Sequence, residues 1–199
     1  MLTLVCSMLA FSLVGSVAPG PVCVVAVAAG AQAGLWRSSA YVLGASLGYT
    51  LMVLLVGLGL LGSLQHQPQL VRVLSWLGAG YLLYLAWRLA TAQVALAGSD
   101  AADQVPGFWA GALAQWLNPK AWLFSTSGIG LFVSGNPAST QTLLLFCMLS
   151  LLMCLLGVGS WALAGHLLGQ RLPGARAMRC FNRGMAALLV VSVAVILWY

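Results

Sequence analysis

Long apolar segments, separated by short polar ones, run along the whole chain. The runs Met1 to Trp36, Ser38 to Val71 and Ala121 to Gln170 contain no Asp, Glu, Lys or Arg. About 20 apolar residues suffice to cross the hydrocarbon core of a bilayer, so each run is long enough to span it. With turn residues as boundaries, the pattern predicts six spans, at about residues 3–30, 39–64, 71–92, 108–134, 140–168 and 180–199.

The last of these segments is the shortest. Only 16 residues follow Arg183, and they make about 24 Å of helix. Arg179 and Arg183 would have to extend along the start of this span to reach the interface. A chain with five spans therefore remains an alternative.

The composition agrees with a membrane location. Of 199 residues, 62% are hydrophobic and 5% are charged, and the mean hydropathy is +1.01, whereas a soluble domain carries about 25% charged residues. We therefore expect an all-α integral membrane protein, with residues 1–199 as one transmembrane domain in the lipid bilayer. The net charge of +6 does not indicate a nucleic-acid partner, because the basic residues lie at span ends.

The distribution of arginine predicts the orientation. The first, third and fifth loops hold or adjoin Arg37, Arg88, Arg171, Arg176, Arg179 and Arg183. The even loops and both termini offer only Arg72. Because cytoplasmic loops are enriched in Lys and Arg, and because Trp36 and Trp87 precede two of these arginines as interfacial residues do, the odd loops should be cytoplasmic. Both the N- and C-termini would then be extracytoplasmic.

The spans divide into two similar halves. Residues 93–106 contain both acidic residues of the chain, Asp100 and Asp103, and form a predicted linker between residues 1–92 and 107–199. Each half has three spans, and an odd number makes the second half enter the membrane from the opposite side. This is the geometry of an inverted repeat, which is common among secondary transporters.

Two interruptions lie in corresponding places of the halves. They are Ala18-Pro19-Gly20-Pro21 and Leu117-Asn118-Pro119-Lys120. Proline removes backbone donors and glycine permits unusual turns, so the first and fourth helices should be broken there. A break within a bilayer is tolerated only where protein or a water-filled cavity surrounds it, and paired breaks are typical of transporter binding sites. The restarted helix after Pro21 would attract a carboxylate with its N-terminus, although a kink without function is the alternative.

Lys120 is the only lysine of the chain and follows the second interruption. A cation at the bilayer centre costs about 2.5–3.5 kcal/mol on insertion scales, which implies a partner or an aqueous cavity. The alternative is that the span begins near Asn118 and Lys120 extends to the interface beside Trp116 and Trp122.

No Asp or Glu lies in any predicted span. A substrate with a carboxylate but no extra positive charge fits this distribution best, so neutral amino acids are favoured over lysine- or arginine-like ones. His166 is a weaker candidate for ion coupling, and a buried structural histidine is the alternative.

Glycine spacing predicts close packing of two helices. Gly44 and Gly48 form G-x-x-x-G in the second span, and Gly165 with Gly169 repeats the spacing in the fifth. Such small residues let helix backbones approach each other. Tyr49, directly after Gly48, would bring a hydroxyl toward a pathway.

The spacing of the cysteines and the absence of a phosphate-binding motif limit the chemistry that the chain can perform. The five cysteines show no C-x-x-C and no metal-ligand spacing, so we expect neither a metal nor a cofactor, and burial as small apolar side chains explains them. The chain has no G-x-x-x-x-G-K-[ST] motif, which excludes a P-loop nucleotide site. Pumping must draw on an ion gradient or on another subunit.

Three blocks of the sequence together resemble a known family. They are Pro19-Gly20-Pro21, Trp76-Leu77-Gly78-Ala79-Gly80-Tyr81-Leu82-Leu83-Tyr84-Leu85 and Leu117-Asn118-Pro119-Lys120-Ala121. In order and spacing they are similar to amino-acid exporters of the LysE/RhtB type, while the part after about Thr140 matches only in hydropathy. The resemblance implies a six-span inner-membrane exporter that exchanges amino acids or related metabolites for protons, with the two proline blocks along the pathway. Family members often carry Asp or Asn after P-G-P, where this chain has Val22.

The leading hypothesis is therefore a secondary active exporter of neutral amino acids, such as homoserine-, threonine- or leucine-like ones, and not an enzyme. A thiol-based electron conduit is a second hypothesis, because Cys23 lies near Pro21, but the fourth segment has no cysteine. A membrane subunit that transports nothing is a third. The sequence leaves open the substrate, the proton-coupling residue and whether copies form a homo-oligomer.

Overall fold

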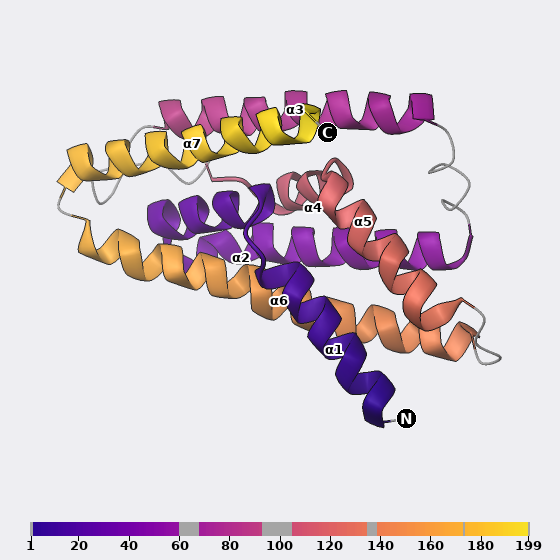
Figure 1. Cartoon of the computed structure of the whole chain (residues 1–199). Coiled ribbons are helices and arrows are strands. Elements are labelled where there is room, and N and C mark those ends of the chain that lie inside the picture. The colour runs from indigo at the N-terminus through magenta and orange to yellow at the C-terminus, as the bar shows by residue number, and fades with distance from the viewer. Residues whose placement is uncertain (1, 60–67, 93–104, 135–138, 173, 199) are drawn as a thin grey trace.

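The computed structural model describes residues 2–59, 68–92, 105–134, 139–172 and 174–198, and within these ranges the chain is helical without strands (Figure 1). The helices are α1 (Leu2–Val17), α2 (Pro21–Gly57), α3 (Pro68–Thr91), α4 (Phe108–Trp116), α5 (Pro119–Gly128), the π-helical turn η3 (Ile129–Val133), α6 (Ser139–Arg171) and α7 (Gly174–Trp198). The predicted all-α class is confirmed. Most of the predicted linker, residues 93–104, lies outside the described residues.

Among the described helices, three are long and apolar enough to cross a membrane. They are α2, α6 and the part Gly174–Ala194 of α7. The last helix begins at Gly174 rather than near residue 180, so it is longer than the predicted span at residues 180–199. The chain is a multi-pass membrane protein, and a six-span inverted repeat remains a prediction.

Helix α2 folds back on itself at Gly34. This glycine has φ 79° and ψ 173°, a conformation that residues with a Cβ rarely adopt. The Tyr41 hydroxyl donates to the Val22 carbonyl at 3.3 Å across a separation of 19 residues, which in a straight helix would be about 28 Å. The arm before Gly34 therefore continues the predicted first span, and the arm after it is the predicted second span.

Both predicted interruptions are present. Helix α1 ends at Val17 before α2 begins at Pro21, and α4 ends at Trp116 before α5 begins at Pro119. In Figure 1, α1 and α5 run obliquely to the longer helices α2, α3, α6 and α7. The segments on either side of each break thus point in different directions.

Glycines bring the first arm of α2 against α6. A Cβ on Gly165 would overlap the backbone of Val27, and one on Gly169 would overlap the backbone of Ala31. Helix backbones are therefore in direct contact here, as small residues in membrane helices allow.

The second arm of α2 packs in the same way against α4. A Cβ on Gly44 would overlap the Phe108 carbonyl, and one on Gly48 would lie 2.9 Å from Ala112 Cα. These contacts fix α4, and with it the start of the second break, against α2.

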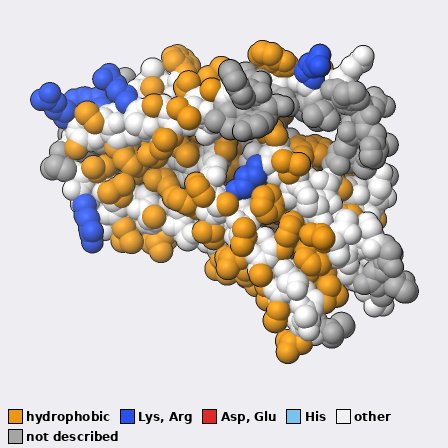
Figure 2. Space-filling view, viewed as in Figure 1, with side chains coloured by type: hydrophobic (Ala, Val, Ile, Leu, Met, Phe, Trp, Pro, Cys, Tyr) orange, Lys and Arg blue, Asp and Glu red, His pale blue; other side chains and the backbone are white. Residues whose placement is uncertain are grey.

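Basic residues gather at one end of the molecule. The side chains of Arg37, Arg171, Arg176, Arg179 and Arg183 are exposed. Figure 2 shows basic side chains gathered at the left end, with others at the centre and the upper right, and hydrophobic side chains over much of the face. The Gly34 turn and the end of α6 lie together, because a Cβ on Gly34 would be 3.5 Å from His166 Nδ1. The arginines of the first and fifth loops are thus on the same side.

Replacing Gly111 tests the contact between α4 and α2. A Cβ there would overlap the Tyr41 carbonyl and lie 2.7 Å from Ala45 N, so Gly111→Ala should lower stability by about 1–3 kcal/mol, as overpacking does. Thermal unfolding of the detergent-purified protein measures this change.

Gly80→Ala is the matched control. Gly80 also lies in a helix, but nothing is within 4 Å of its Cβ position, so this variant should be as stable as the parent or more stable. Equal unfolding temperatures for Gly111→Ala and the parent would contradict the packing account.

Candidate functional site

The end of α1 receives side-chain hydrogen bonds from three other helices. The bonds run from Cys23 Sγ to Ser16 O (3.7 Å), from Trp161 Nε1 to Val17 O (3.1 Å) and from Lys120 Nζ to Ala18 O (2.6 Å). The last carbonyls of a helix have no intrahelical donor and need partners within a membrane. Here α2, α6 and α5 supply them, so the break is completed only when these helices are assembled.

The second break is also closed by side chains. The Asn118 side chain accepts a hydrogen bond from Lys120 N at 3.1 Å and so caps α5. Trp122 Nε1 donates to Trp116 O at 2.8 Å, and Trp116 Nε1 donates to Gly48 O at 3.0 Å. Both indoles therefore bond to the protein backbone around the break.

Lys120 connects the two breaks. It belongs to the first turn of α5, and its ammonium group bonds to Ala18 at the C-terminal end of α1, where the helix dipole favours a cation. The ammonium also lies 5.7 Å from the centroid of the Phe124 ring, within reach of a cation–π interaction. An ammonium group has three donors, so the bond to Ala18 leaves capacity for a ligand.

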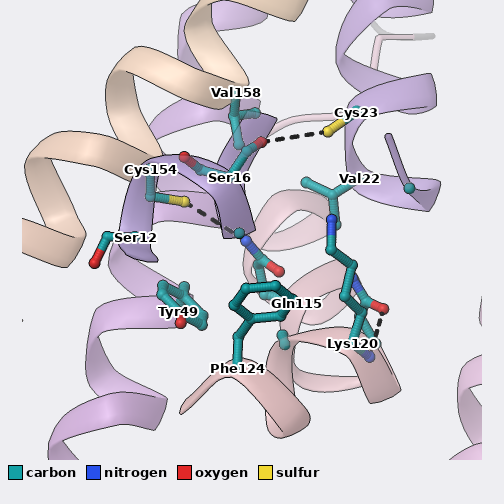
Figure 3. A pocket seen from close by; sticks show the side chains of 14 residues that line it. Ser12, Ser16, Val22, Cys23, Tyr49, Gln115, Lys120, Phe124, Cys154 and Val158 are labelled. Atoms are coloured by element: carbon teal, nitrogen blue, oxygen red, sulfur yellow. Dashed lines mark hydrogen bonds between the residues drawn. The ribbon is translucent and has the colours of Figure 1, made fainter. Parts of the chain in front are cut away.

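A cavity lies where the breaks meet. It opens in part to the outside. The lining comes from α1, α2, α4, α5 and α6, with residues of both breaks among it, and Figure 3 shows the side chains. Lys120 thus borders this cavity.

The predicted site residues fall into two groups. Gly20, Asn118, Lys120 and Tyr49 line the cavity. Pro19 is exposed, Pro21 is buried and Pro119 is partly buried, and these three prolines act on the backbone at the breaks rather than as cavity walls.

Other polar residues of the wall were not predicted. They are Ser12, Ser16, Cys23, Gln115 and Cys154. The polarity of Gln115 within an apolar span was a usable signal, whereas the two cysteines fitted burial equally well. All five cysteines are free thiols, and within the described ranges no three His, Cys, Asp or Glu side chains gather as a metal site requires.

Four phenylalanine rings pack together beside the cavity. Phe11 lies 5.3 Å from Phe124 and 5.6 Å from Phe132, and Phe132 lies 5.5 Å from Phe146, between ring centroids. Only Phe124 lines the cavity, and Phe132 belongs to η3. This phenylalanine cluster therefore meets the cavity through the Phe124 ring.

His166 lies away from this site. Its Nε2 atom is 3.1 Å from Gln170 Nε2 on the same helix, and its ring is close to the Gly34 turn. It does not belong to the residues that line the cavity.

Interrupted helices that meet at a cavity are typical of one class of multi-pass membrane proteins, the transporters whose central site is formed by discontinuous helices. The family model for the LysE type translocator matches residues 13–199. The chain therefore belongs to the LysE-type translocator family, whose members are transporters and not enzymes.

Curated relatives agree with the family. The cysteine/O-acetylserine efflux protein of Salmonella choleraesuis (strain SC-B67) is 34% identical over 196 residues, covering 95% of this chain and 94% of the relative. The protein of the same name in Escherichia coli (strain K12) is 33% identical over 204 residues, covering 99% and 98%. No solved structure matches the chain.

The cap of α5 gives a test of the second break. Asn118→Ala removes the acceptor for Lys120 N and should cost about 1 kcal/mol, seen as a lower unfolding temperature in detergent. Serine is close to alanine in size but has an oxygen that can cap the helix. Asn118→Ser should therefore unfold at a temperature closer to that of the parent than Asn118→Ala does. If both variants unfold at the same temperature, the cap does not stabilise the break.

Proposed function

We propose that this protein is a secondary active exporter that moves neutral amino acids, or closely related metabolites, outward across the inner membrane. The observation that carries the proposal is the position of Lys120. Its ammonium joins the two breaks and borders the cavity between them. A fixed cation beside two helix starts is suited to hold a carboxylate for transport.

The carboxylate would meet more than one positive group. The first turn of α2 contains Val22 and Cys23, both in the cavity wall, and the N–H groups of a first turn have no intrahelical acceptor. They and the positive end of the helix dipole attract anions. The substrate ammonium would face the carbonyls at the end of α1, including that of Ala18.

The charge of the cavity limits the substrate. Its wall contains one cation, Lys120, and no carboxylate among the described residues. A second positive charge on a substrate would therefore find no fixed counter-charge. Small neutral amino acids fit, and the relatives named for cysteine and O-acetylserine efflux support this range.

We propose alternating access between two closures of the cavity. The phenylalanine cluster, which meets the cavity at Phe124, would close one side, and the glycine contacts of α2 with α6 and α4 hold the helices together elsewhere. The halves 1–92 and 107–199, arranged as an inverted repeat, would move against each other around the breaks. The end rich in arginine would be cytoplasmic and both termini extracytoplasmic.

The proposed coupling ion is the proton, which the sequence resemblance implies. The hypothesis of a thiol-based electron conduit gains little support. It requires a cysteine at each break, but Cys23 lies at the first break and the second has Lys120 instead of a thiol. Membership of a translocator family also gives no support to a subunit that transports nothing.

Lys120→Met tests the proposal. The variant keeps the length of the side chain but removes the charge, and loss of a hydrogen bond to a charged group costs about 1.5–3 kcal/mol. Efflux of amino acids from expressing cells should fall by about tenfold or more, while the amount of inserted protein stays the same.

Arg72→Met is the control for this experiment. Arg72 is exposed on α3, outside the cavity, so the same loss of charge there should leave efflux intact. Efflux by Lys120→Met at the rate of the parent would show that Lys120 does not hold the substrate.

A further inference from the structure

The side chain of Gln115 is buried at the cavity with little to bind. It lies in the last turns of α4 and is 7% exposed. Its Nε2 donates to Cys154 Sγ at 3.7 Å, and the described residues provide no other hydrogen bond to this side chain. A carboxamide has two donors and an acceptor oxygen, and a thiol sulfur is a weak acceptor.

The small number of hydrogen bonds to the Gln115 side chain needs a physical reason. Buried side-chain amides in proteins are normally hydrogen-bonded, and an amide with only a weak partner is unfavourable. The amide does not gain a strong protein partner, yet it borders the cavity beside Lys120. A ligand with hydrogen-bonding groups would supply the missing bonds.

The position of Gln115 defines which part of a ligand it would meet. Figure 3 shows Gln115 between Lys120 on one side and Cys154 with Ser12 on the other. A substrate whose carboxylate is at Lys120 would direct its side chain toward the amide. Phe124 and Val158 bound the same cavity with apolar surface and leave the amide as a polar group within reach.

We propose that Gln115 determines specificity by hydrogen-bonding the side chain of the exported amino acid. This inference rests on the proposed function, with the carboxylate at Lys120. Because the amide both donates and accepts, it suits a hydroxyl, a thiol or an ester carbonyl near the Cα. Small polar amino acids are therefore the substrates, and leucine-like ones are disfavoured, since they would leave the amide unpaired.

Three amino acids test this inference. Serine, cysteine and 2-aminobutyrate differ only in a terminal hydroxyl, thiol or methyl group. Purified protein in lipid vesicles is loaded with labelled serine, and the three compounds compete for exchange. The parent should prefer serine and cysteine over 2-aminobutyrate by about tenfold or more, and this ratio does not depend on the amount of active protein.

Gln115→Met should bring the ratio close to one, because methionine has a similar length but cannot pair with a polar group. Gln32→Met is the matched control: Gln32 bonds to Ala28 O and lies outside the cavity, so its ratio should equal that of the parent.

Cys154→Ala removes the hydrogen-bond partner of Gln115 but not the Gln115 amide, so this variant should keep the preference for serine and cysteine. If the Gln115–Cys154 contact had only a structural role, Gln115→Met and Cys154→Ala would change the substrate ratio equally. That result would overturn the inference.

Gln115→Asn provides a second variant if Gln115→Met does not fold. Asparagine is one methylene shorter than glutamine, so the amide lies farther from the substrate. Homoserine, whose hydroxyl extends one methylene farther than that of serine, should then be favoured over serine. An unchanged order of substrates in a folded variant contradicts the inference, while the exporter proposal stands as long as the parent transports and Lys120→Met does not. Absence of any amino-acid exchange by the parent would overturn the exporter proposal itself.

Discussion

Backbone groups at an interrupted helix must find partners, and this requirement organises the centre of the protein. The end of α1 takes donors from α2, α5 and α6, and its bond from Lys120 reaches across from the second break. The lysine is held by the negative end of one helix while its own helix begins beside it. Polar groups that a bilayer would exclude are thus concentrated around one cavity.

Packing around this centre uses two kinds of surface. Glycines bring the backbones of α2, α4 and α6 into contact, which leaves these helices close together. Phenylalanine rings from α1, α5, η3 and α6 instead form a cluster that reaches the cavity at Phe124. Rings can change rotamers without breaking backbone contacts, so this side is the more suitable one for opening, and a π-helical turn such as η3 often accompanies functional sites.

Much of this arrangement follows from the sequence, because proline and glycine act locally. The breaks at residues 18–21 and 117–120 and the close packing at Gly44 and Gly165 needed no knowledge of the fold. The turn at Gly34 was not predicted as such, since one glycine among 23 shows its positive φ only when both arms of α2 are placed. Gln115 was missed for a related reason: its burial beside Cys154 depends on how α4 meets α6. The relation of the two halves as an inverted repeat remains a prediction.

We propose that Lys120 and the adjoining helix starts bind the carboxylate of an amino acid. Equilibrium binding of serine and of serinamide to the purified protein, measured by calorimetry for the parent and for Lys120→Met, tests it most directly. The account predicts that the parent binds serine at least about tenfold more tightly than the amide and that Lys120→Met loses this difference. Equal affinities of the parent for the two compounds, or an unchanged difference in Lys120→Met, would contradict it.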